Sequence, residues 1–572
     1  MLSKRLGICE YVTIKETCKV LKTSQVFNTV SAIFEYLKVM ETVETIGSGK
    51  QVSMQRLSTK IYKSEFVSNF DGDDSGDLRP RQTPGVLYSK AIPTSVKSPR
   101  LIAWSDELAK ELGIEKPVTP DDINILGGNL VTASMYPYAA CYAGHQFGQW
   151  AGQLGDGRAI TLGEWEVPDG KSWELQLKGA GPTAYSRRAD GRAVLRSSVR
   201  EYLMSEAMFH LNVPTTRALS LVTTGENIVR DMFYDGHPQN EPGAIVMRVS
   251  PGFLRFGNFE ILAARGELSN LRKLADWTIG KYFPHIEGEN KILLWFREVM
   301  ERTAGLMAEW LRVGFVHGVM NTDNMSVLGL TIDYGPYSFI DDYDRNFTPN
   351  TTDLPGRRYA FGRQPSVAHW NLGCFAGAIA PLFDDTEKLS AELDAYTDIF
   401  IRKYHTMMGN KLGLDEVSAE DVPLINEFEK TLSVIKPDMT IFYQRLTELH
   451  ADIENSKDIL LHFKDSFYKD LQESEGHELH SLITTYIERV KKNKCPRAES
   501  HMRMRKTNPR FILRNYLLHQ AIEDLEKGDD RLFVKLQEAM KEPYSNRFDE
   551  FFIKRPDWAT QKAGCSMLSC SS

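Results

Sequence analysis

The sequence lacks three features that would assign it to a class at once. It has no run of about 18 consecutive apolar residues, the length that a membrane-spanning helix needs. It has no basic excess, because 69 Lys and Arg face 76 Asp and Glu and the net charge is −7, so nucleic acid is not an expected partner. Cysteines are scarce, at 7 of 572 residues. The remaining composition, 42% hydrophobic and 25% charged residues, predicts a folded, soluble protein of about two to four domains.

The few cysteines do not form a recognisable framework. Their number is odd and no pair has the spacing of zinc ligands, so we expect neither a disulfide-built secreted scaffold nor a zinc finger. The compartment is predicted to be reducing. Two cysteines lie close together near the end of the chain, Cys565 and Cys570. A flexible tail brings two thiols within bonding distance whatever their spacing, so chance and a redox pair both remain open.

Residues 1–60 are interpreted as an N-terminal extension. Five Lys and Arg face two Glu in the first thirty residues, among several Ser and Thr. This composition favours a mitochondrial transit peptide, and without one the protein is expected in the cytoplasm. Residues 26–40 place apolar side chains on one helical face, and that helix belongs either to the presequence or to the folded body.

The rest of the chain changes pattern twice. Residues 61–265 alternate strand-like runs, Gly-rich turns and one strong helix, and the Gly-, Asp- and Pro-rich segment 70–84 predicts an exposed linker. Residues 266–384 are mostly helical apart from an Asn- and Asp-rich stretch, and amphipathic helices dominate residues 385–572. We therefore predict an α+β fold with a mixed lobe, a helical lobe and a helical C-terminal extension.

Glycines gather in GQWAGQLGDGRAITLGE, residues 148–164. The four glycines before the final ITLGE strand, Gly155 and Gly157 among them, are predicted to share one turn. Glycine lets a backbone approach phosphate groups closely, and Arg158 at the end of the turn adds a charged fork for a phosphate. A plain hairpin turn is the alternative.

The next strand and helix carry a lysine and a glutamate in the order found in protein kinases. SWELQLKG alternates apolar and polar residues, which predicts a half-buried strand with Lys178 opposite its apolar face. The helix that follows carries Glu201. In kinases the strand lysine holds nucleotide phosphates and the helix glutamate holds the lysine. The alternative is a surface lysine and a surface glutamate that never meet.

The segment between that strand and helix is GAGPTAYSRRADGRA, residues 179–193, which is too polar for a core. Asp190 and Gly191 come just before the helix, so Asp190 is a natural N-cap, and a ligand-binding role can coexist with it. The GxG of this segment also suggests a dinucleotide fingerprint, but the third glycine of that motif is missing.

A second polar stretch, residues 314–335, resembles the layout of a kinase catalytic loop. Asn324 comes seven residues after His317, and Asp333 follows in an Ile-Asp-Tyr-Gly turn. In kinases the Asn and the later Asp hold the metal that bridges the phosphates, because hard oxygen ligands suit Mg²⁺. The sequence therefore predicts a metal site at Asn324 and Asp333.

The catalytic aspartate of a kinase is absent from this loop. Val319 occupies its position, two residues after the histidine, and cannot accept a proton. Asp323 is the nearest carboxylate that can substitute. The metal apparatus is thus predicted to survive while the usual base of phosphoryl transfer is lost.

Two further pairs of charged residues leave alternatives open. SFIDDYD brings Asp341 and Asp342 after an apolar run, and either could replace the predicted metal ligand Asp333. IVMRVSPGFLRFG places Arg248 and Arg255 seven residues apart, where they could flank an anion. As single arginines they are more typical of surface ion pairs.

Taken together, these segments resemble one family, selenoprotein O, whose members are pseudokinase-fold protein adenylyltransferases. The similarity runs from about residue 60 to the C-terminus. The matching blocks are YAGHQFGQWAGQLGDGRA, LQLKGAGPTAYSRRADGRAVLRSSVREYL, RVSPGFLRFGNFE, HGVMNTDNMS, TIDYGPYSFID and NPRFILRNYL.

The resemblance implies a bilobal kinase-like fold that binds ATP with Mg²⁺ or Mn²⁺. The nucleotide is flipped relative to active kinases, and AMP is transferred to Ser, Thr or Tyr hydroxyls of other proteins. By match of motif, Lys178 and Glu201 resemble the family's phosphate-binding pair, and Asp323 its proposed base. The matching nucleotide contacts and metal ligands are Gly155, Gly157, Arg158, Asp190, Gly191, Arg248, Arg255, Asn324 and Asp333.

The tail resembles the family too. Many eukaryotic members end in selenocysteine followed by Ser-Ser, and this chain ends in Cys570-Ser571-Ser572. The resemblance implies mitochondrial residence, a role in redox homeostasis and a regulatory disulfide with Cys565, although four residues separate the two cysteines here. The alternatives to AMP transfer are a phosphotransferase with Asp323 as base, a nucleotide-binding scaffold without activity, and a thiol-redox protein.

Overall fold

The computed structural model describes residues 53–232, 235–450, 456–560, 562–565 and 567–569. The predicted transit peptide and the helix at 26–40 lie outside the described residues. Residues 54–572 form one compact unit. The segment 70–84 is mostly exposed or half-buried, as predicted, but it is not a linker, because it contributes strand β1 (Gly72–Asp73) to the sheet of this unit.

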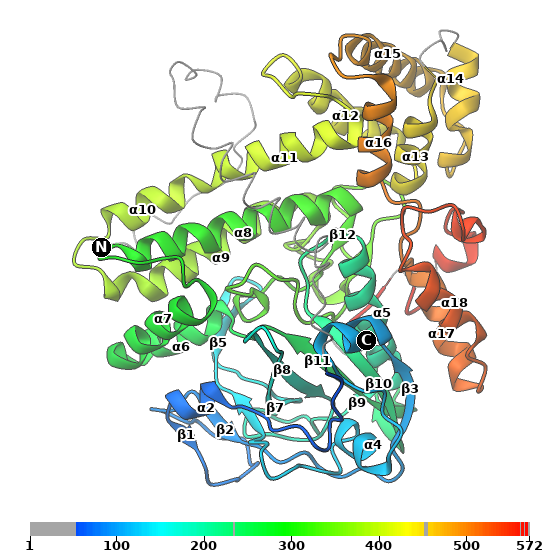
Figure 1. Ribbon diagram of the computed structural model, residues 1–572. Coiled ribbons are helices and arrows are strands. Elements are labelled where there is room, and N and C mark those ends of the chain that lie inside the picture. The colour runs from blue at the N-terminus through cyan, green and yellow to red at the C-terminus, as the bar shows by residue number, and fades with distance from the viewer. Residues whose placement is uncertain (1–52, 233–234, 451–455, 561, 566, 570–572) are drawn as a thin grey trace. The chain divides into compact units, whose positions relative to one another are not determined.

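A mixed sheet carries the N-terminal part of this unit (Figure 1). Nine strands of the described residues belong to it, in the order β1-β2-β4-β7-β8-β11-β10-β3, with β9 paired to β11. All its pairs are antiparallel except β1 with β2. The strand bounds are β1 Gly72–Asp73, β2 Tyr88–Lys90, β3 Arg100–Trp104, β4 Tyr138–Ala140, β7 Ala159–Glu166, β8 Ser172–Lys178, β9 Ala193–Val194, β10 Arg217–Arg230 and β11 Gln239–Ser250.

The register of the central strands gathers polar residues on one face. Arg248 of β11 pairs directly with Gln176 of β8, and Lys178 lies two residues further along β8. Because side chains alternate between the faces of a strand, these three share a face. The strand was predicted to be half-buried, and this is wrong: β8 is buried on both faces from Glu174 to Lys178. Arg248 of β11 donates to Gln176, and Lys178 pairs with Glu201 of the following helix.

Helix α5 (Leu195–His210) packs across β10 and β11. It begins five residues after Asp190, with Val194 as N-cap and no side-chain cap, so the prediction that Asp190 caps this helix is wrong. The reason is that the preceding segment closes on itself through a bridge between Ala180 and Arg192. Most of the helix is buried, including its polar residue Glu201.

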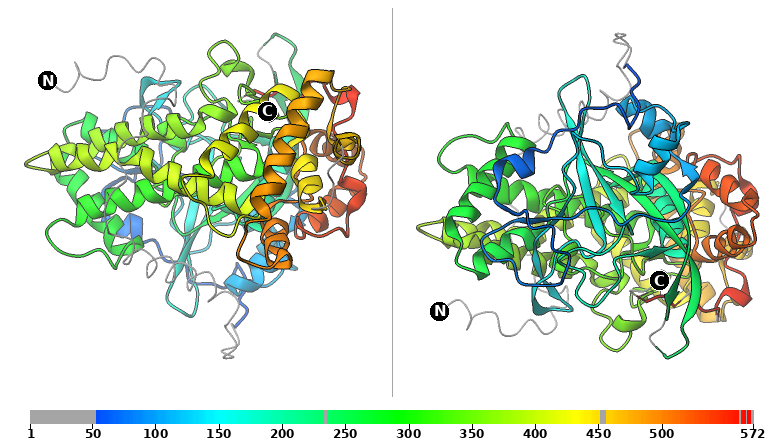
Figure 2. Two further views of the ribbon diagram at one scale, coloured as in Figure 1. Left: turned by 90° about the horizontal axis from the view of Figure 1, so that it is seen from above. Right: turned by 90° about the horizontal axis from the view of Figure 1, so that it is seen from below.

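The long helices lie on one side of the sheet, and Figure 2 shows the sheet in front of them when seen from below. The long helix α8 ends at Gly314, whose φ of 80° is the left-handed conformation typical of a helix terminus. Helices α8 and α11 run side by side (Figures 1 and 2). The helices before residue 384 are α2 Glu65–Asn69, α3 Asp106–Leu112, α4 Pro120–Leu126, α6 Phe256–Ala264, α7 Leu268–Tyr282, α8 Lys291–Val313 and α9 Gln364–Ile379.

Aromatic packing under the site joins α6, α8 and α9. The rings of Phe256 and Phe375 stack with centroids 4.6 Å apart, and Trp295 packs edge-on against Phe375 at 5.4 Å. From α9, the Asn371 side chain donates to the carbonyl of Met320 at 2.9 Å. The core thereby supports the polar loop that follows α8.

Two short ribbons border that loop. One pairs β5 (Ala143–Gln146) with β6 (Gln149–Gln153), and the other pairs β12 (Phe315–Val316) with β13 (Ser338–Phe339). Between β12 and β13 lies the 3-10 turn Thr322–Asn324. The second ribbon brackets the stretch that was predicted to bind metal.

The C-terminal region is helical, as predicted, and its end returns to the sheet lobe. Helix α17 packs on α5, where Arg200 donates to Asn515 at 3.1 Å. Among the described residues, no helix combines the length and apolarity that crossing a membrane requires. The helices are α10 Glu387–Asp394, α11 Tyr396–Leu412, α12 Val422–Ile435, α13 Met439–Glu448, α14 Ser456–Phe463, α15 Glu473–Val490, α16 Arg497–Thr507, α17 Asn515–Glu526 and α18 Arg531–Ala539.

Candidate active site

Lys178 and Glu201 meet, as their order in the sequence predicts. The ammonium of Lys178, at the end of β8, lies 2.7 Å from Oε2 of Glu201 in the middle of α5. Their side chains are only 11% and 3% exposed. The alternative of two separate surface residues is therefore wrong.

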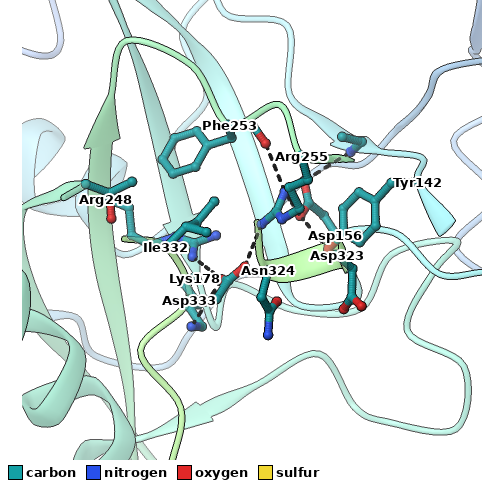
Figure 3. A network of polar contacts seen from close by, with 12 residues as sticks. Tyr142, Asp156, Lys178, Arg248, Phe253, Arg255, Asp323, Asn324, Ile332 and Asp333 are labelled. Atoms are coloured by element: carbon teal, nitrogen blue, oxygen red, sulfur yellow. Dashed lines mark hydrogen bonds and ion pairs between the residues drawn. The ribbon is translucent and has the colours of Figure 1, made fainter. Parts of the chain in front are cut away.

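Two arginines and this lysine converge on Asp333 (Figure 3). Arg248 donates to Oδ1 of Asp333 at 2.5 Å, and Arg255 donates to Oδ2 at 2.8 Å. Lys178 lies 3.7 Å from Oδ1. Neither arginine makes the surface ion pair that its single occurrence suggested, because both side chains are 1% exposed.

The charges of this cluster compensate one another. Although burial works against ionisation, the charges of Arg255, Arg248 and Lys178 hold the pKa of Asp333 well below its usual value. Burial lowers the pKa of Lys178, and the charge of Glu201 opposes that shift. Asp333 also has a φ of 61°, in the left-handed region that costs a non-glycine residue free energy. The carboxylate is thus ionised and held in place by the cations around it.

Asp156 is a member of this network that the sequence did not reveal. Its carboxylate accepts from the hydroxyl of Tyr142 at 3.2 Å and lies 3.5 Å from Nη1 of Arg255. The ring of Tyr142 also faces the guanidinium of Arg255, 4.6 Å from the ring centroid. In the sequence, the one sign that Asp156 belongs to a constrained loop is its position between Gly155 and Gly157.

The Gly-rich segment is spread over several elements, so the prediction that its four glycines share one turn is wrong. Gly148 joins β5 to β6 and Gly152 lies within β6. Gly155 and Gly157 do lie together, between β6 and β7. A Cβ at Gly155 would come 2.5 Å from Cγ of Tyr185, and one at Gly157 would come 2.9 Å from its carbonyl oxygen. These two positions require glycine because the loop lies against the polar segment 179–193.

The same polar segment fixes the loop by hydrogen bonds. The Thr183 hydroxyl donates to the carbonyl of Asp156 at 2.7 Å, and Ser186 donates to the carbonyl of Gly157. Arg158 at the end of the loop is half-buried, and its charge lowers the pKa of Lys178. Arg158 is therefore close enough to this lysine for their charges to interact.

Asp190 and Gly191 make their contacts outside the cluster. Asp190 pairs with Arg230 at 2.7 Å and accepts from the backbone of Arg192 at 2.9 Å. Gly191 has a φ of 68°, and a Cβ there would come 2.2 Å from the backbone of Gly181. Their contacts stabilise the turn of the 179–193 segment, and no described contact joins them to Lys178 or Asp333.

The 3-10 turn Thr322–Asn324 places Asp323 and Asn324 beside Asp333. The Asn324 amide nitrogen donates to the carbonyl of Val319 at 3.0 Å, which leaves its Oδ1 for another partner. Asp323 is 9% exposed, and its Oδ1 has no hydrogen-bond partner among the described residues. Burial raises the pKa of Asp323 to about 7. In Figure 3 Asn324 lies between Asp323 and Asp333.

His317 organises this loop from within the core. Its Nε2 lies 2.9 Å from the carbonyl of Ile332, and its ring stacks on Trp310 at 5.4 Å. Burial lowers the pKa of His317, which keeps the imidazole neutral. The histidine thereby ties the start of the loop to the residue that precedes Asp333.

Asp341 and Asp342, the alternative candidates for the metal ligand, pair with arginines outside the cluster. Asp341 binds Arg514 at 2.6 Å and Arg555 at 3.2 Å, and Asp342 lies 3.3 Å from Arg555. Both arginines come from the C-terminal region. The geometry therefore places Asp333, and neither of these two, beside Asn324.

The free hydrogen-bonding capacity of the cluster fits a nucleotide with its metal ion. The Nε atoms of Arg248 and Arg255 are buried without a partner among the described residues, and they suit phosphate oxygens. The oxygens of Asn324, Asp333 and Asp323 form a hard donor set of the kind that Mg²⁺ and Mn²⁺ take.

Cys565 is buried, and burial raises the pKa of its thiol to about 11. Such a thiol is protonated near neutral pH and is a poor nucleophile. Cys570 lies outside the described residues, so its predicted disulfide with Cys565 stays a prediction.

A family model described as protein adenylyltransferase SelO matches residues 81–541, from before the Gly-rich segment to beyond α18. This chain belongs to the SelO family. The protein nucleotidyltransferase YdiU of Cytophaga hutchinsonii is 59% identical over 519 residues, which cover 91% of this chain and 100% of that protein. The YdiU protein of Azoarcus sp. is 51% identical over 519 residues, covering 90% and 99%.

The matched SelO region contains every residue of the cluster around Asp333. A solved structure, ROP2 from Toxoplasma gondii, is described as a virulence factor with a protein-kinase fold and no enzymatic activity. It aligns with a TM-score of 0.22 and 13% identity over 51% of this chain and 86% of its own. The kinase-like arrangement rests on the strand lysine, helix glutamate and polar loop of this SelO chain.

Proposed function

We propose that this SelO-family chain transfers AMP from ATP to hydroxyl side chains of other proteins and releases pyrophosphate. The observation that carries the proposal is the convergence of three buried cations, Lys178, Arg248 and Arg255, on one carboxylate. Fixed positive charge in a water-poor site stabilises the charge that builds on a leaving group. Family membership supports AMP as the transferred group.

Each charged residue of the site has a separate role in the proposed reaction. The acceptor oxygen forms a bond to the α-phosphorus, and the bond from that phosphorus to the β-phosphate oxygen breaks. Lys178, held by Glu201, and the two arginines neutralise the departing pyrophosphate. Asp323 takes the hydroxyl proton, and a pKa of about 7 suits a base near neutral pH.

Asn324 and Asp333 would hold Mg²⁺ or Mn²⁺ through their side-chain oxygens. A bound divalent ion lowers the cost of charge on the phosphates. Positioning and charge stabilisation carry most of such a reaction, so the valine in place of the kinase aspartate does not preclude it.

One observation favours a second reaction. The raised pKa of Asp323 equips the site equally for a base that assists transfer of the γ-phosphate. Incubation with ATP labelled in either the α- or the γ-phosphate separates the two. Label in protein from the α-position alone supports AMP transfer, and label from the γ-position alone supports a kinase.

The label experiment needs two variants beside the wild type. Lys178→Ala removes a cation of the cluster, and Lys388→Ala removes an exposed lysine of α10. We expect α-label in the wild type and in Lys388→Ala and little in Lys178→Ala. Equal label in all three would contradict the proposed site, and no label with any acceptor mixture would favour a nucleotide-binding scaffold.

Mitochondrial residence and a role in redox homeostasis remain proposals. They rest on the composition of the first thirty residues and on the cysteines of the tail. Imaging of the full chain and of a chain that lacks residues 1–52 tests mitochondrial residence. Comparing AMP transfer by oxidised and reduced protein tests the redox role, and equal rates would exclude regulation by a thiol switch.

A further inference from the structure

Three side chains with different ligand atoms meet beside the catalytic loop. His145 comes from β5, Glu260 from α6 and Cys374 from α9, and one ligand atom of each lies within 4.8 Å of the other two. His145 Nδ1 and Glu260 Oε1 are 2.6 Å apart. None of the three was singled out by the sequence, because they are spread over more than two hundred residues.

One carboxylate oxygen of Glu260 is buried and unsatisfied within the described part of the chain. Its side chain is 3% exposed, and its Oε2 is buried with no hydrogen-bond partner among the described residues. A buried carboxylate oxygen without a donor or a cation costs free energy. His145 contacts the other oxygen, Oε1, so Oε2 is left without a positive partner among the described residues.

We propose that His145, Glu260 and Cys374 form a site for one divalent cation of borderline softness, with Zn²⁺ as the best fit. One nitrogen, one carboxylate oxygen and one sulfur are the ligand types that Zn²⁺ combines. Mg²⁺ and Ca²⁺ are disfavoured, because they select oxygen donors. The site is separate from the oxygen donors Asn324 and Asp333.

Binding requires a small rearrangement. Bond lengths of about 2.0–2.3 Å in a tetrahedral zinc site place ligand atoms about 3.3–3.7 Å apart. The hydrogen bond between His145 and Glu260 must therefore open, and the thiol of Cys374 loses its proton on binding. Three protein ligands leave a fourth position for water.

The cation would stabilise the catalytic loop through β5. The backbone N–H of His145 donates to the hydroxyl of Thr322 at 2.7 Å, at the start of the turn with Asp323 and Asn324. Two residues further, the N–H of Phe147 donates to Oδ1 of Asn321 at 3.2 Å. A metal on His145 therefore anchors the β5–β6 ribbon where it contacts that turn.

Cobalt is a spectroscopic probe for this site, because a thiolate bound to Co²⁺ gives a charge-transfer band in the near ultraviolet. The full chain, without an affinity tag and stripped by chelator, is titrated with Co²⁺ and then with Zn²⁺. Cys374→Ser removes the sulfur ligand. Cys495→Ser is the matched control, since Cys495 is also a half-buried free cysteine but lies outside the cluster.

We expect the wild type and Cys495→Ser to bind one equivalent of Co²⁺ with the band, and Zn²⁺ to abolish it. Cys374→Ser should lack the band, and His145→Ala should bind Co²⁺ at least about 10-fold more weakly. A wild type without the band, or an unchanged band in Cys374→Ser, overturns the proposal. Circular dichroism confirms that each variant is folded.

The site stands apart from AMP transfer, and a further variant separates the two. Asp333→Asn removes a residue of the candidate active site and leaves His145, Glu260 and Cys374 intact. We expect it to keep the cobalt band while losing AMP transfer. Loss of the band in this folded variant would show that the cation site depends on the nucleotide site, and would overturn the proposal.

Discussion

Arg248 and Asp333 form an ion pair with Nη1 and Oδ1 2.5 Å apart, joining the central strand β11 to the polar loop. Arg255 occupies the other carboxylate oxygen at 2.8 Å. Both oxygens of the residue that was predicted to bind metal are thus held by arginines. Phosphates of a nucleotide offer these arginines other acceptors, and the carboxylate is then free for a metal ion. We therefore expect nucleotide and metal binding to be coupled at Asp333.

Replacing Asp333 with asparagine should lower stability. The change leaves the buried Arg248 and Arg255 without their carboxylate, and breaking a buried pair in this way costs about 3–5 kcal/mol. We expect the free energy of unfolding in urea to fall by that amount, and ATP to raise the thermal midpoint more than in the wild type.

Asp394→Asn is the control for that experiment, because Asp394 is exposed at the end of α10. Its free energy of unfolding should stay within about 0.5 kcal/mol of the wild type. An equally small loss in Asp333→Asn would show that the arginines do not depend on this carboxylate.

Removing the ammonium of Lys178 should slow AMP transfer. We expect Lys178→Ala to lower kcat by about 10²–10³, in line with the loss of one preorganised charge donor. The change is measured by steady-state release of pyrophosphate at saturating ATP and acceptor protein. A near-normal rate would exclude this lysine from the reaction.

Glu201→Gln should move the alkaline limb of the pH–rate profile. Burial lowers the pKa of Lys178, and the charge of Glu201 opposes this. Without that charge the pKa falls further, so Lys178 loses its proton at a lower pH. The decline in kcat at high pH should then begin earlier than in the wild type, and an unchanged limb would mean that the lysine charge is not required.

Asp323 makes opposite contributions to rate and stability as pH rises. Its pKa is raised from 3.8 to about 7 by burial. The folded state therefore binds a proton more tightly than the unfolded state, so the contribution of Asp323 to stability is full below about pH 4 and is lost as pH rises to about 7. The rate should increase over the upper part of this range as the base is deprotonated.

Asp323→Asn tests both effects. The variant should lose the acidic limb of the pH–rate profile and unfold with less pH dependence than the wild type between about pH 4 and 7. An acidic limb that persists in the variant would assign the proton transfer to another group.

A methyl group at Gly144 should disturb Asp323. A Cβ at this position would come 2.6 Å from Oδ1 of Asp323 and 2.9 Å from its Cβ. Gly144→Ala is expected to lower kcat with little change in the affinity for ATP. Gly280→Ala is the control, because a Cβ there meets nothing within 4 Å in α7; it should be neutral or stabilising by up to about 1 kcal/mol.

The order of residues along the chain was enough to predict some contacts but not others. The spacing of Lys178 and Glu201 predicted their contact because a strand followed by a helix is a local unit. Asp156 escaped prediction because its partners Tyr142 and Arg255 are brought to it by the sheet register and by α6. Distant pairing of this kind leaves no periodic signal in a single sequence.

Burial was the property most often misjudged. As single arginines, Arg248 and Arg255 were more typical of surface ion pairs than of a buried site, but a shared carboxylate makes their burial tolerable. Asp190 was expected to cap a helix because residue type and position agreed, yet a backbone bridge delays the helix to Leu195. In both cases tertiary contacts override a local preference.

Intact mass spectrometry of the purified chain with an acceptor protein, ATP and Mg²⁺ or Mn²⁺ tests the central claim most directly. We predict a mass gain of one AMP group on the acceptor or on the chain itself, with pyrophosphate released in equal amount, and its loss in Lys178→Ala but not in Lys388→Ala. A gain of one phosphate group instead, or an AMP gain that survives in Lys178→Ala, would contradict the account.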